Sequence, residues 1–264
     1  AREAVSLVTN NTTRVIDAST AHRVATGWTY GFAELERGQR SRIAASTRVG
    51  NPGCYATGAV ALLRPVVAAG LVPADFPLTI NAISGYSGGG KGLIAEYERG
   101  ESPAPDTFRV YGLTLKHKHI PEIVAYAGLA HAPLFAPAVG NYHQGMLVEV
   151  PLQLWALPGT PSPERLREAL ADHYAGERYV TVAGAEETAE LAKARVGAAG
   201  YTPALDPESL NGTNSMRIFV FGNEAGDQAI LIAVLDNLGK GASSAAVQNL
   251  NLMLGLDEGA GIAA

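Results

Sequence analysis

Residues 48–69, RVGNPGCYATGAVALLRPVVAA, are the stretch from which the fold can be worked out. The Asn-Pro-Gly sequence at 51–53 predicts a tight turn, because these three residue types favour turn conformations. The apolar stretch that follows, rich in small residues, predicts a helix from Cys54 that Gly70 and Pro73 end. The turn therefore places the cysteine at the first position of a buried helix.

A cysteine at the start of a helix has two possible meanings. The first N–H groups of a helix lack intrahelical partners and carry partial positive charge. They would lower the pKa of the Cys54 thiol and make it a better nucleophile, and they could also hold an oxyanion. A lone cysteine is equally often a small, inert, buried side chain, so both interpretations stay open on this feature alone.

The rest of the chain has the alternating patterns of an α/β protein with antiparallel strands in its middle and second half. Residues 19–38 are expected to form a polar loop, and residues 223–227 a hairpin-like connection. We expect strands at 14–18, 78–84, 145–154, 179–183, 215–222 and 228–235, and helices at 2–9, 122–129, 164–174 and 243–254.

Composition excludes several classes of protein. The chain has 264 residues, 47% hydrophobic and 17% charged, which suits one large or two modest folded domains and not a disordered chain. Its net charge of -5 and the absence of a Lys/Arg cluster argue against nucleic-acid binding. The longest apolar run, 229–235, is far short of the roughly 20 residues of a membrane helix. A single cysteine excludes an internal disulfide and a cysteine-based zinc site, so we expect a cytoplasmic protein.

A second chemical signal is the Lys-His-Lys-His sequence at 116–119. If this segment is extended, His117 and His119 point to the same face, and a histidine beside a thiolate is a common base or ion-pair partner. The flanking lysines suit an acidic or phosphorylated substrate. No third ligand stands at a spacing that would complete a metal site. The alternative is a solvated basic loop.

A third signal is the glycine-rich stretch 84–92, SGYSGGGKG. It contains the Gly-x4-Gly-Lys spacing of a phosphate-binding P-loop, and the run 229–235 ends in Asp236 as a Walker B strand would. Gly92, however, stands where a P-loop needs Ser or Thr to hold Mg²⁺. Consecutive glycines could still hold a phosphate through their N–H groups, or form a plain surface loop. A P-loop nucleotide-binding protein therefore remains an alternative function.

Four motifs taken together resemble a known family. They are NPGCYATG at 51–58, SGYSGGGK at 84–91, HKHIPE at 117–122 and DNLGKGA at 236–242. Over its whole length the chain resembles the short, type 2 N-acetyl-gamma-glutamyl-phosphate reductases, and more distantly the aspartate-semialdehyde dehydrogenases. The resemblance implies an oxidoreductase of arginine biosynthesis that makes N-acetylglutamate semialdehyde from the acyl phosphate with NADPH.

The same resemblance implies roles for individual residues. Cys54 would form a thioester, with His119 or His117 as the acid/base. The stretch 17–23, DASTAHR, matches the family's Asp-x-Ser-x-x-x-Arg pattern, with His22 where we expect Phe. Substrate would be bound by Arg23, Ser19 and Asn51. The cofactor would be lined by Ser84, Gly85, Ser87, Gly88, Gly89, Asn237, Lys240 and Gly241.

The resemblance also implies the architecture. Residues 1–53 and 237–264 would form an incomplete doubly wound, Rossmann-like NADP-binding domain. Residues 54–236 would form an α+β catalytic and dimerisation domain with a mainly antiparallel sheet, in a homodimer or tetramer. About fifty residues that open the family's nucleotide domain have no match here. We therefore expect these 264 residues alone to bind NADPH weakly and to aggregate through strand 14–18, and a non-catalytic remnant is a third possible interpretation.

Overall fold

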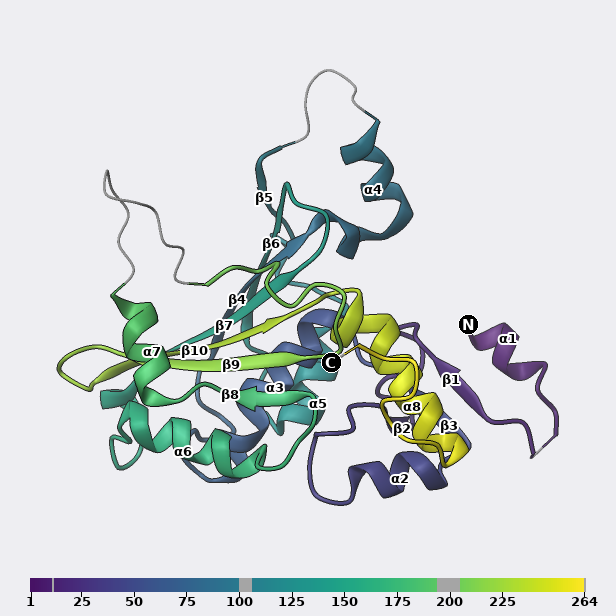
Figure 1. Ribbon diagram of the computed structural model, residues 1–264, viewed down its shortest axis with the longest axis horizontal. Coiled ribbons are helices and arrows are strands. Elements are labelled where there is room, and N and C mark those ends of the chain that lie inside the picture. The colour runs from purple at the N-terminus through teal and green to yellow at the C-terminus, as the bar shows by residue number, and fades with distance from the viewer. Residues whose placement is uncertain (11, 100–105, 194–204, 264) are drawn as a thin grey trace.

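The strands of this protein form two sheets. The computed structural model describes residues 1–10, 12–99, 106–193 and 205–263 (Figure 1). The smaller sheet has the order β1-β3-β2 and is parallel. The larger has the order β5-β6-β4-β7-β10-β9-β8. The strands are β1 (Val15–Asp17), β2 (Thr29–Tyr30), β3 (Arg48–Gly50), β4 (Thr79–Gly85), β5 (Phe108–Val110), β6 (Leu134–Gly140), β7 (Met146–Gln153), β8 (Val180–Val182), β9 (Met216–Gly222) and β10 (Gln228–Leu235).

The large sheet is mixed but mainly antiparallel, as the sequence predicts. Pairs β5–β6, β4–β7, β7–β10 and β9–β10 are antiparallel, whereas β4–β6 and β8–β9 are parallel. The longest ladder pairs Met146 with Leu235 at one end and Gln153 with Gln228 at the other. The sequence of strand β10 is one apolar run, because its side chains point alternately to the two faces of the sheet and each face is covered by an apolar cluster.

Helix α3 lies against the middle of this sheet and carries most of the core. It packs against β7 and β10, and helices α5 and α6 pack beside it (Figure 1). Nearly all of its side chains are buried, which explains the unbroken apolar sequence after Cys54. The helices are α1 (Arg2–Ser6), α2 (Gln39–Ala45), α3 (Cys54–Ala68), α4 (Gly90–Glu98), α5 (Ile120–Ala127), α6 (Pro163–His173), α7 (Ala185–Ala192) and α8 (Ser244–Leu254).

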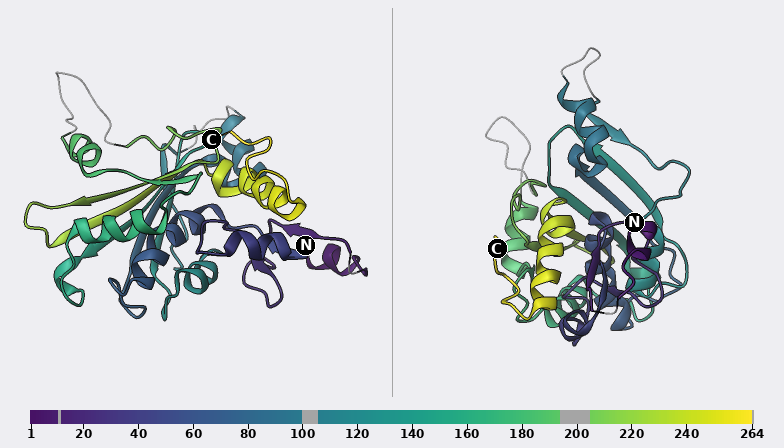
Figure 2. Two further views of the ribbon diagram at one scale, coloured as in Figure 1. Left: turned by 60° about the horizontal axis from the view of Figure 1, so that its bottom comes forward. Right: turned by 90° about the vertical axis from the view of Figure 1, so that its right-hand side faces the viewer.

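The small sheet joins the two ends of the chain. Helix α8 packs against α2 and β1, so residues close to the C-terminus lie beside the N-terminal strands (Figures 1 and 2). Ala33, Ile43, Val49 and Met253 form the apolar cluster between them. Strand β1 lies at one edge of this sheet. No helix among the described residues has the length and apolar character to cross a membrane.

Seven helices and strands were not expected from the sequence: β2, β3, β5, β6, α2, α4 and α7. Strand β6 is the most instructive, because Pro137 within it disfavours a central strand. In the structure Pro137 lies just beyond the three residues of β6 that pair with β5. The polar-loop expectation for 19–38 was wrong for its second half, where Tyr30, Phe32 and Leu35 are buried in the main core. Residues 111–119 form turns instead of an extended strand.

The close approach of α3 to the sheet generates a stability prediction at Gly58. A Cβ at this position would lie 2.7 Å from Cγ2 of Val148. Glycine within a helix normally costs about 1 kcal/mol relative to alanine. Here we expect Gly58→Ala to destabilise the protein instead, by about 1–3 kcal/mol, because it overpacks the core.

Urea unfolding measures the effect, and Gly92→Ala in α4 is the matched control. Nothing lies within 4 Å of a Cβ at Gly92, which is exposed. The control should gain about 0.5–1 kcal/mol. A Gly58→Ala protein as stable as the control would contradict the close approach of helix and sheet.

Candidate active site

The turn and helix predicted around Cys54 are both present. Gly53 is the N-cap of α3 and Cys54 its first residue. The carbonyl of Gly53 accepts hydrogen bonds from the N–H and the hydroxyl of Thr57, at 2.8 and 3.0 Å. The N–H of Gly53 donates to Oε1 of Glu122 at 2.8 Å. The N–H and the carbonyl of Gly53 are therefore both hydrogen-bonded, and these bonds fix the position of the cysteine that follows.

A cavity of about 450 Å³ opens at this helix start. It brings together most of the residues that sequence reasoning proposed for the site. The proposed residues that line it are Arg23, Asn51, Cys54, Ser84, Ser87, Gly88, Gly89, His117, His119, Asn237 and Gly241. Ser19, Gly85 and Lys240 are not among its lining residues. The wall also contains residues that were not proposed, including Tyr55, Arg109, Tyr111 and Lys118.

His117 and His119 lie together although their segment is not a strand. Their ring centroids are 4.8 Å apart. The backbone N–H of His119 donates to Nδ1 of His117 at 3.2 Å, so the neutral His117 ring carries its proton on Nε2. His119 is 3% exposed, and its Nδ1 has no partner among the described residues. Burial lowers the pKa of His119 to about 2 and that of His117 to about 4, so both rings are neutral at pH 7.

Two glycines next to Cys54 have no room for a side chain. A Cβ on Gly53 would lie 2.3 Å from Nε2 of His119 and 2.4 Å from Nη1 of Arg23. A Cβ on Gly241 would lie 2.7 Å from the Cβ of Cys54. The φ of Gly53 is −83°, which any residue can adopt, so it is the space that requires glycine here. His119 and Arg23 consequently reach the backbone directly before the thiol.

The thiol does not have the lowered pKa that its helix position predicts. Burial raises the pKa of Cys54 to about 11. A hydrogen bond from the backbone of Tyr55 and the charges of Lys118 and Arg23 act in the opposite direction, but they are the smaller effects. The expectation was wrong because loss of hydration of the thiolate outweighs the favourable dipole and cations.

Arg23 is held in place before any ligand binds. Its Nε donates to the carbonyl of Asn51 at 2.9 Å, and its Nη2 to the carbonyl of Ala18 at 2.8 Å. Its Nη1 lies 3.4 Å from Oε2 of Glu122. These contacts leave N–H groups that can still face the cavity, in the fork geometry that suits phosphate.

Glu122 is a site residue that sequence reasoning missed. Its carboxylate is 1% exposed and accepts hydrogen bonds from Gly53 and from the hydroxyl of Tyr30, at 2.9 Å for the latter. Burial raises its pKa, and the charge of Arg23 opposes that effect. The signal was present in the HKHIPE motif, where a glutamate begins an otherwise apolar helix.

The other proposed substrate residues make contacts within the protein. Ser19 donates to Oδ2 of Asp17 at 2.7 Å, outside the cavity lining. Asn51 lines the cavity, but its Nδ2 donates to the carbonyl of Ala242 at 2.9 Å and its Oδ1 accepts from Asn249 at 3.0 Å. Asn51 therefore joins the turn before α3 to the turn before α8.

The glycine-rich stretch forms one wall of the cavity. After β4 it continues as a 3-10 helix (Tyr86–Gly89) and then α4. Asn237 ties this wall to the end of β10: its Nδ2 donates to Oγ of Ser87 at 3.0 Å, and its Oδ1 accepts from the N–H of Gly145 at 2.7 Å. Gly85 packs against the backbone of His143, only 2.6 Å from the position of a Cβ, which explains why it is small.

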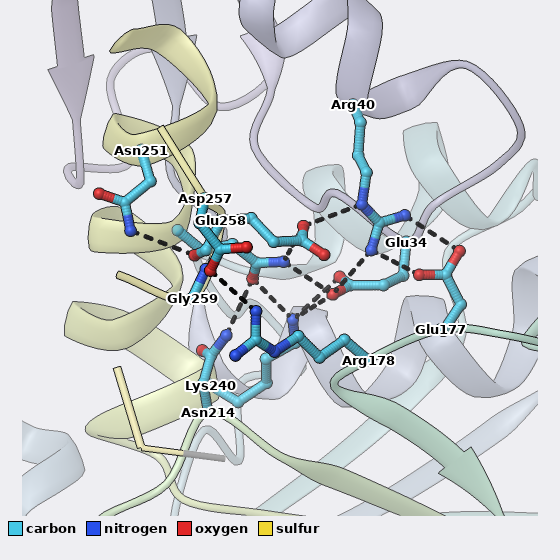
Figure 3. Close-up of polar contacts among 11 residues, drawn as sticks. Glu34, Arg40, Glu177, Arg178, Asn214, Lys240, Asn251, Asp257, Glu258 and Gly259 are labelled. Carbon is cyan, nitrogen blue, oxygen red and sulfur yellow. Dashed lines mark hydrogen bonds and ion pairs between the residues drawn. The ribbon is translucent and has the colours of Figure 1, made fainter. Parts of the chain in front are cut away.

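Lys240, proposed as a cofactor ligand, points away from the cavity. Its side chain is 1% exposed and is paired with Glu34 (Figure 3). Asp236 is also occupied: its carboxylate accepts from Gln144 at 3.0 Å and from the N–H groups of Gly212 and Leu238, at 2.8 Å each. It therefore offers nothing to a Walker-type metal site. Among the described residues, no group of three or more His, Cys, Asp or Glu could hold a metal ion.

The fold and site define the class of protein. Residues 54–237 match the family model described as "Semialdehyde dehydrogenase, dimerisation domain". Two solved aspartate semialdehyde dehydrogenases share the fold, each covering 91% of this chain. The aspartate semialdehyde dehydrogenase II of Vibrio cholerae superimposes with a TM-score of 0.62; it is 16% identical, and 72% of its own length is covered. The Francisella tularensis enzyme superimposes with a TM-score of 0.59; it is 13% identical, and 74% of its length is covered.

Sequence relatives narrow the class. The N-acetyl-gamma-glutamyl-phosphate reductase of Chelativorans sp. is 56% identical, over 96% of this chain and 79% of that protein. The reductase of Mesorhizobium japonicum is 54% identical over 97% and 80%, and the second such reductase of Nostoc sp. is 51% identical over 99% and 80%. The chain belongs to the N-acetyl-gamma-glutamyl-phosphate reductases, within the semialdehyde dehydrogenase family.

The raised thiol pKa generates a prediction that needs neither substrate nor cofactor. Only the thiolate reacts with iodoacetamide. With a pKa of about 11, the alkylation rate of Cys54 should rise about tenfold per pH unit from pH 7 to 10, without a plateau. Mass spectrometry reports on one thiol because the chain has one cysteine, and Cys54→Ser is the blank. A plateau below pH 8 would mean that the thiolate is already formed at neutral pH.

Proposed function

We propose that this protein reduces N-acetyl-gamma-glutamyl phosphate to N-acetylglutamate semialdehyde and phosphate, with NADPH, in arginine biosynthesis. One observation carries the proposal: the lone thiol opens into a cavity whose described lining holds three cations and no carboxylate. The cations are Arg23, Arg109 and Lys118. Such a lining suits an anionic substrate with an electrophilic carbonyl, and the close relatives are named for such a substrate.

Cys54 is the nucleophile in this proposal. Its sulfur attacks the acyl carbon, phosphate leaves with the electrons of the C–O bond, and a thioester forms. We assign the thiol proton to His119, whose Nε2 would lie 2.3 Å from a Cβ on Gly53, the residue directly before Cys54. The first turn of α3 has backbone N–H groups free to stabilise the oxyanion. The Nδ1 of His117 already accepts a hydrogen bond, so the neutral ring of His117 can only donate, through its Nε2–H group.

Arg23 and Lys118 have different roles in this proposal. Arg23, fixed by Asn51 and Ala18, is placed to hold the leaving phosphate in a bidentate contact. Lys118 is an exposed residue of the cavity wall and one of the charges that act on Cys54. It neutralises negative charge that develops during attack on the carbonyl.

The glycine wall suits the cofactor. When bound, NADPH would supply the hydride that reduces the thioester to the aldehyde. Its reactive end would be held by Ser87, Gly88, Gly89, Asn237 and Gly241. The fit rests on the backbone at Gly88, which lies so close to Ser84 that a Cβ there would stand 2.9 Å from the serine hydroxyl, so a side chain is excluded at this position. Lys240 is not part of this set, because its ammonium is buried elsewhere.

Assembly and domain division complete the proposal. We expect residues 1–53 and 237–264 to form the nucleotide-binding part, and residues 54–236 the catalytic and dimerisation part. The family model that matches residues 54–237 is named for dimerisation, which supports a homo-oligomer, a dimer or a tetramer. We expect the protein to act in the cytoplasm.

Replacement of the nucleophile tests the function directly. Cys54→Ser should keep the fold and reduce the rate of acyl-phosphate-dependent NADPH oxidation by about 10³-fold or more, because a serine hydroxyl loses its proton far less readily than a thiol. Intact-mass spectrometry should detect a thioester in the parent enzyme given acyl phosphate without NADPH, and none in the variant. Substantial turnover by Cys54→Ser would remove Cys54 from this role.

A conservative change at Arg23 tests phosphate binding. Arg23→Lys keeps the charge but loses the planar fork. We expect the KM for acyl phosphate to rise about tenfold, a loss of about 1.4 kcal/mol, with the KM for NADPH within twofold. Arg165→Lys, on the exposed start of α6, is the control and should change neither. An equal rise in both constants would argue against a role specific to the substrate.

A further inference from the structure

The buried side chain of Lys240 is unexplained by the reaction. Its Nζ donates to both carboxylate oxygens of Glu34, at 2.8 and 2.9 Å, and to Oε1 of Gln248 at 3.0 Å (Figure 3). The rings of Phe32 and Tyr179 lie 5.7 and 5.5 Å from the same atom. An ammonium group has three donors, and all three are used, so none remains for a ligand.

Glu34 is held as firmly as its partner. Its side chain is fully buried, and Oε1 also accepts from Nε2 of Gln248 at 2.9 Å. Arg40 lies 3.8 Å away and pairs with Glu177 and Glu258 at 2.5 and 2.9 Å (Figure 3). These ion pairs connect four segments of the chain: residues 34–40, the turn before α8 that carries Lys240, the segment before β8 that carries Glu177, and the C-terminal residues that include Glu258.

The turn that carries Lys240 is unusual. Gly239–Ser243 is a π-helix, with hydrogen bonds from Gly241 to Asp236 and from Ser243 to Leu238, at 2.9 and 2.8 Å. Such short π-turns are rare and occur frequently at functional sites. A Cβ on Gly239 would lie 2.1 Å from the carbonyl of Thr213, and one on Gly241 2.7 Å from Cβ of Cys54. The glycines press the turn against its neighbours while Lys240 anchors it in the interior.

Stability alone does not account for a buried ion pair. The cost of removing two charges from water often exceeds their attraction, and apolar replacements of similar volume are frequently as stable. A buried ion pair can instead fix a conformation. An ammonium group that makes three hydrogen bonds can do so in one side-chain position, whereas an apolar side chain can pack in several. The turn held in this way forms the wall next to the thiol.

We propose that Lys240 is a positioning residue, whose ion pair with Glu34 fixes the Gly239–Ser243 turn against Cys54 and so sets the exposure and attack direction of the thiol. The proposal rests on the proposed role of Cys54 as the nucleophile. It assigns Lys240 to the same site as the cofactor residues, but through the turn and not through contact with a ligand.

The test replaces both charges at once, because a single substitution would leave an unpaired buried charge and could unfold the protein. The variant is Glu34→Leu with Lys240→Met. Gln248 keeps partners in it, since its Oε1 accepts from Asn214 at 2.9 Å and its Nε2 donates to Glu258 at 3.2 Å. The control, Glu190→Leu with Lys193→Met, removes an exposed ion pair at the end of α7.

Two measurements should move in opposite directions. With the turn released, the partly exposed thiol becomes more accessible to solvent, and alkylation of Cys54 by iodoacetamide at pH 8 should be about threefold faster or more. The kcat for acyl-phosphate reduction should fall about tenfold, since displacements of about 1 Å can cost up to 10²-fold. The KM for acyl phosphate should stay within twofold. The control should match the parent enzyme in all three.

The outcomes separate this proposal from the function on which it rests. A double variant that melts near the parent temperature and keeps the parent alkylation rate and kcat would overturn the proposal, because the pair would then serve stability alone. A variant that is too unstable to purify would also overturn it, since the pair would be needed for folding. If the parent enzyme does not reduce the acyl phosphate, the proposed function fails, and the alkylation rates still decide whether the pair positions the thiol.

Discussion

The absence of side chains at Gly53 and Gly241 is the constraint on which the site depends. These backbones approach Cys54 so closely that a single added carbon would displace His119, Arg23 or the cysteine itself. Three separate parts of the chain can therefore meet around Cys54 in one cavity: the turn after β3, the segment before α5 and the π-turn before α8. Close approach of backbone to a reactive group is a main use of glycine, and here it occurs twice around one thiol.

Charges around the cavity are arranged in two layers. The described lining holds cations and no carboxylates, which leaves its positive potential available to an anionic ligand. Two buried acids lie behind the wall: Glu122 holds Arg23 and the N–H of Gly53, and Glu34 holds Lys240, which is not part of the lining. Arg109 is paired instead with the exposed acids Glu96 and Asp106. Because Glu122 and Glu34 are buried and hydrogen-bonded, they orient the site without competing for the ligand.

Local patterns were sufficient for much of the fold and for Cys54, His117, His119 and the glycine-rich stretch 84–92, whereas the remaining candidate residues came from the family resemblance. The Asn-Pro-Gly turn, the apolar helix after Cys54 and the strands with clear alternation needed no tertiary information. Strand β6 was missed because Pro137 argues locally against a strand, and its pairing partners lie more than twenty residues away in sequence. Lys240 was assigned to the cofactor through the family resemblance. Its motif does lie beside the site, but its ammonium is buried against Glu34, which is more than two hundred residues away in sequence.

The pKa of Cys54 is the property for which the local sequence and the folded environment point in opposite directions. A helix N-terminus and two cations favour the thiolate, but burial outweighs them and raises the pKa of Cys54 to about 11. A resting thiol is a poor nucleophile, and it is also resistant to oxidation and stray alkylation. In the proposed reaction the proton would therefore leave during the attack itself, and a neutral group nearby would have to accept it. The same loss of hydration that keeps the proton on sulfur keeps the His119 ring uncharged, and it also disfavours the protonated ring, so any transfer to His119 has to be coupled to the attack.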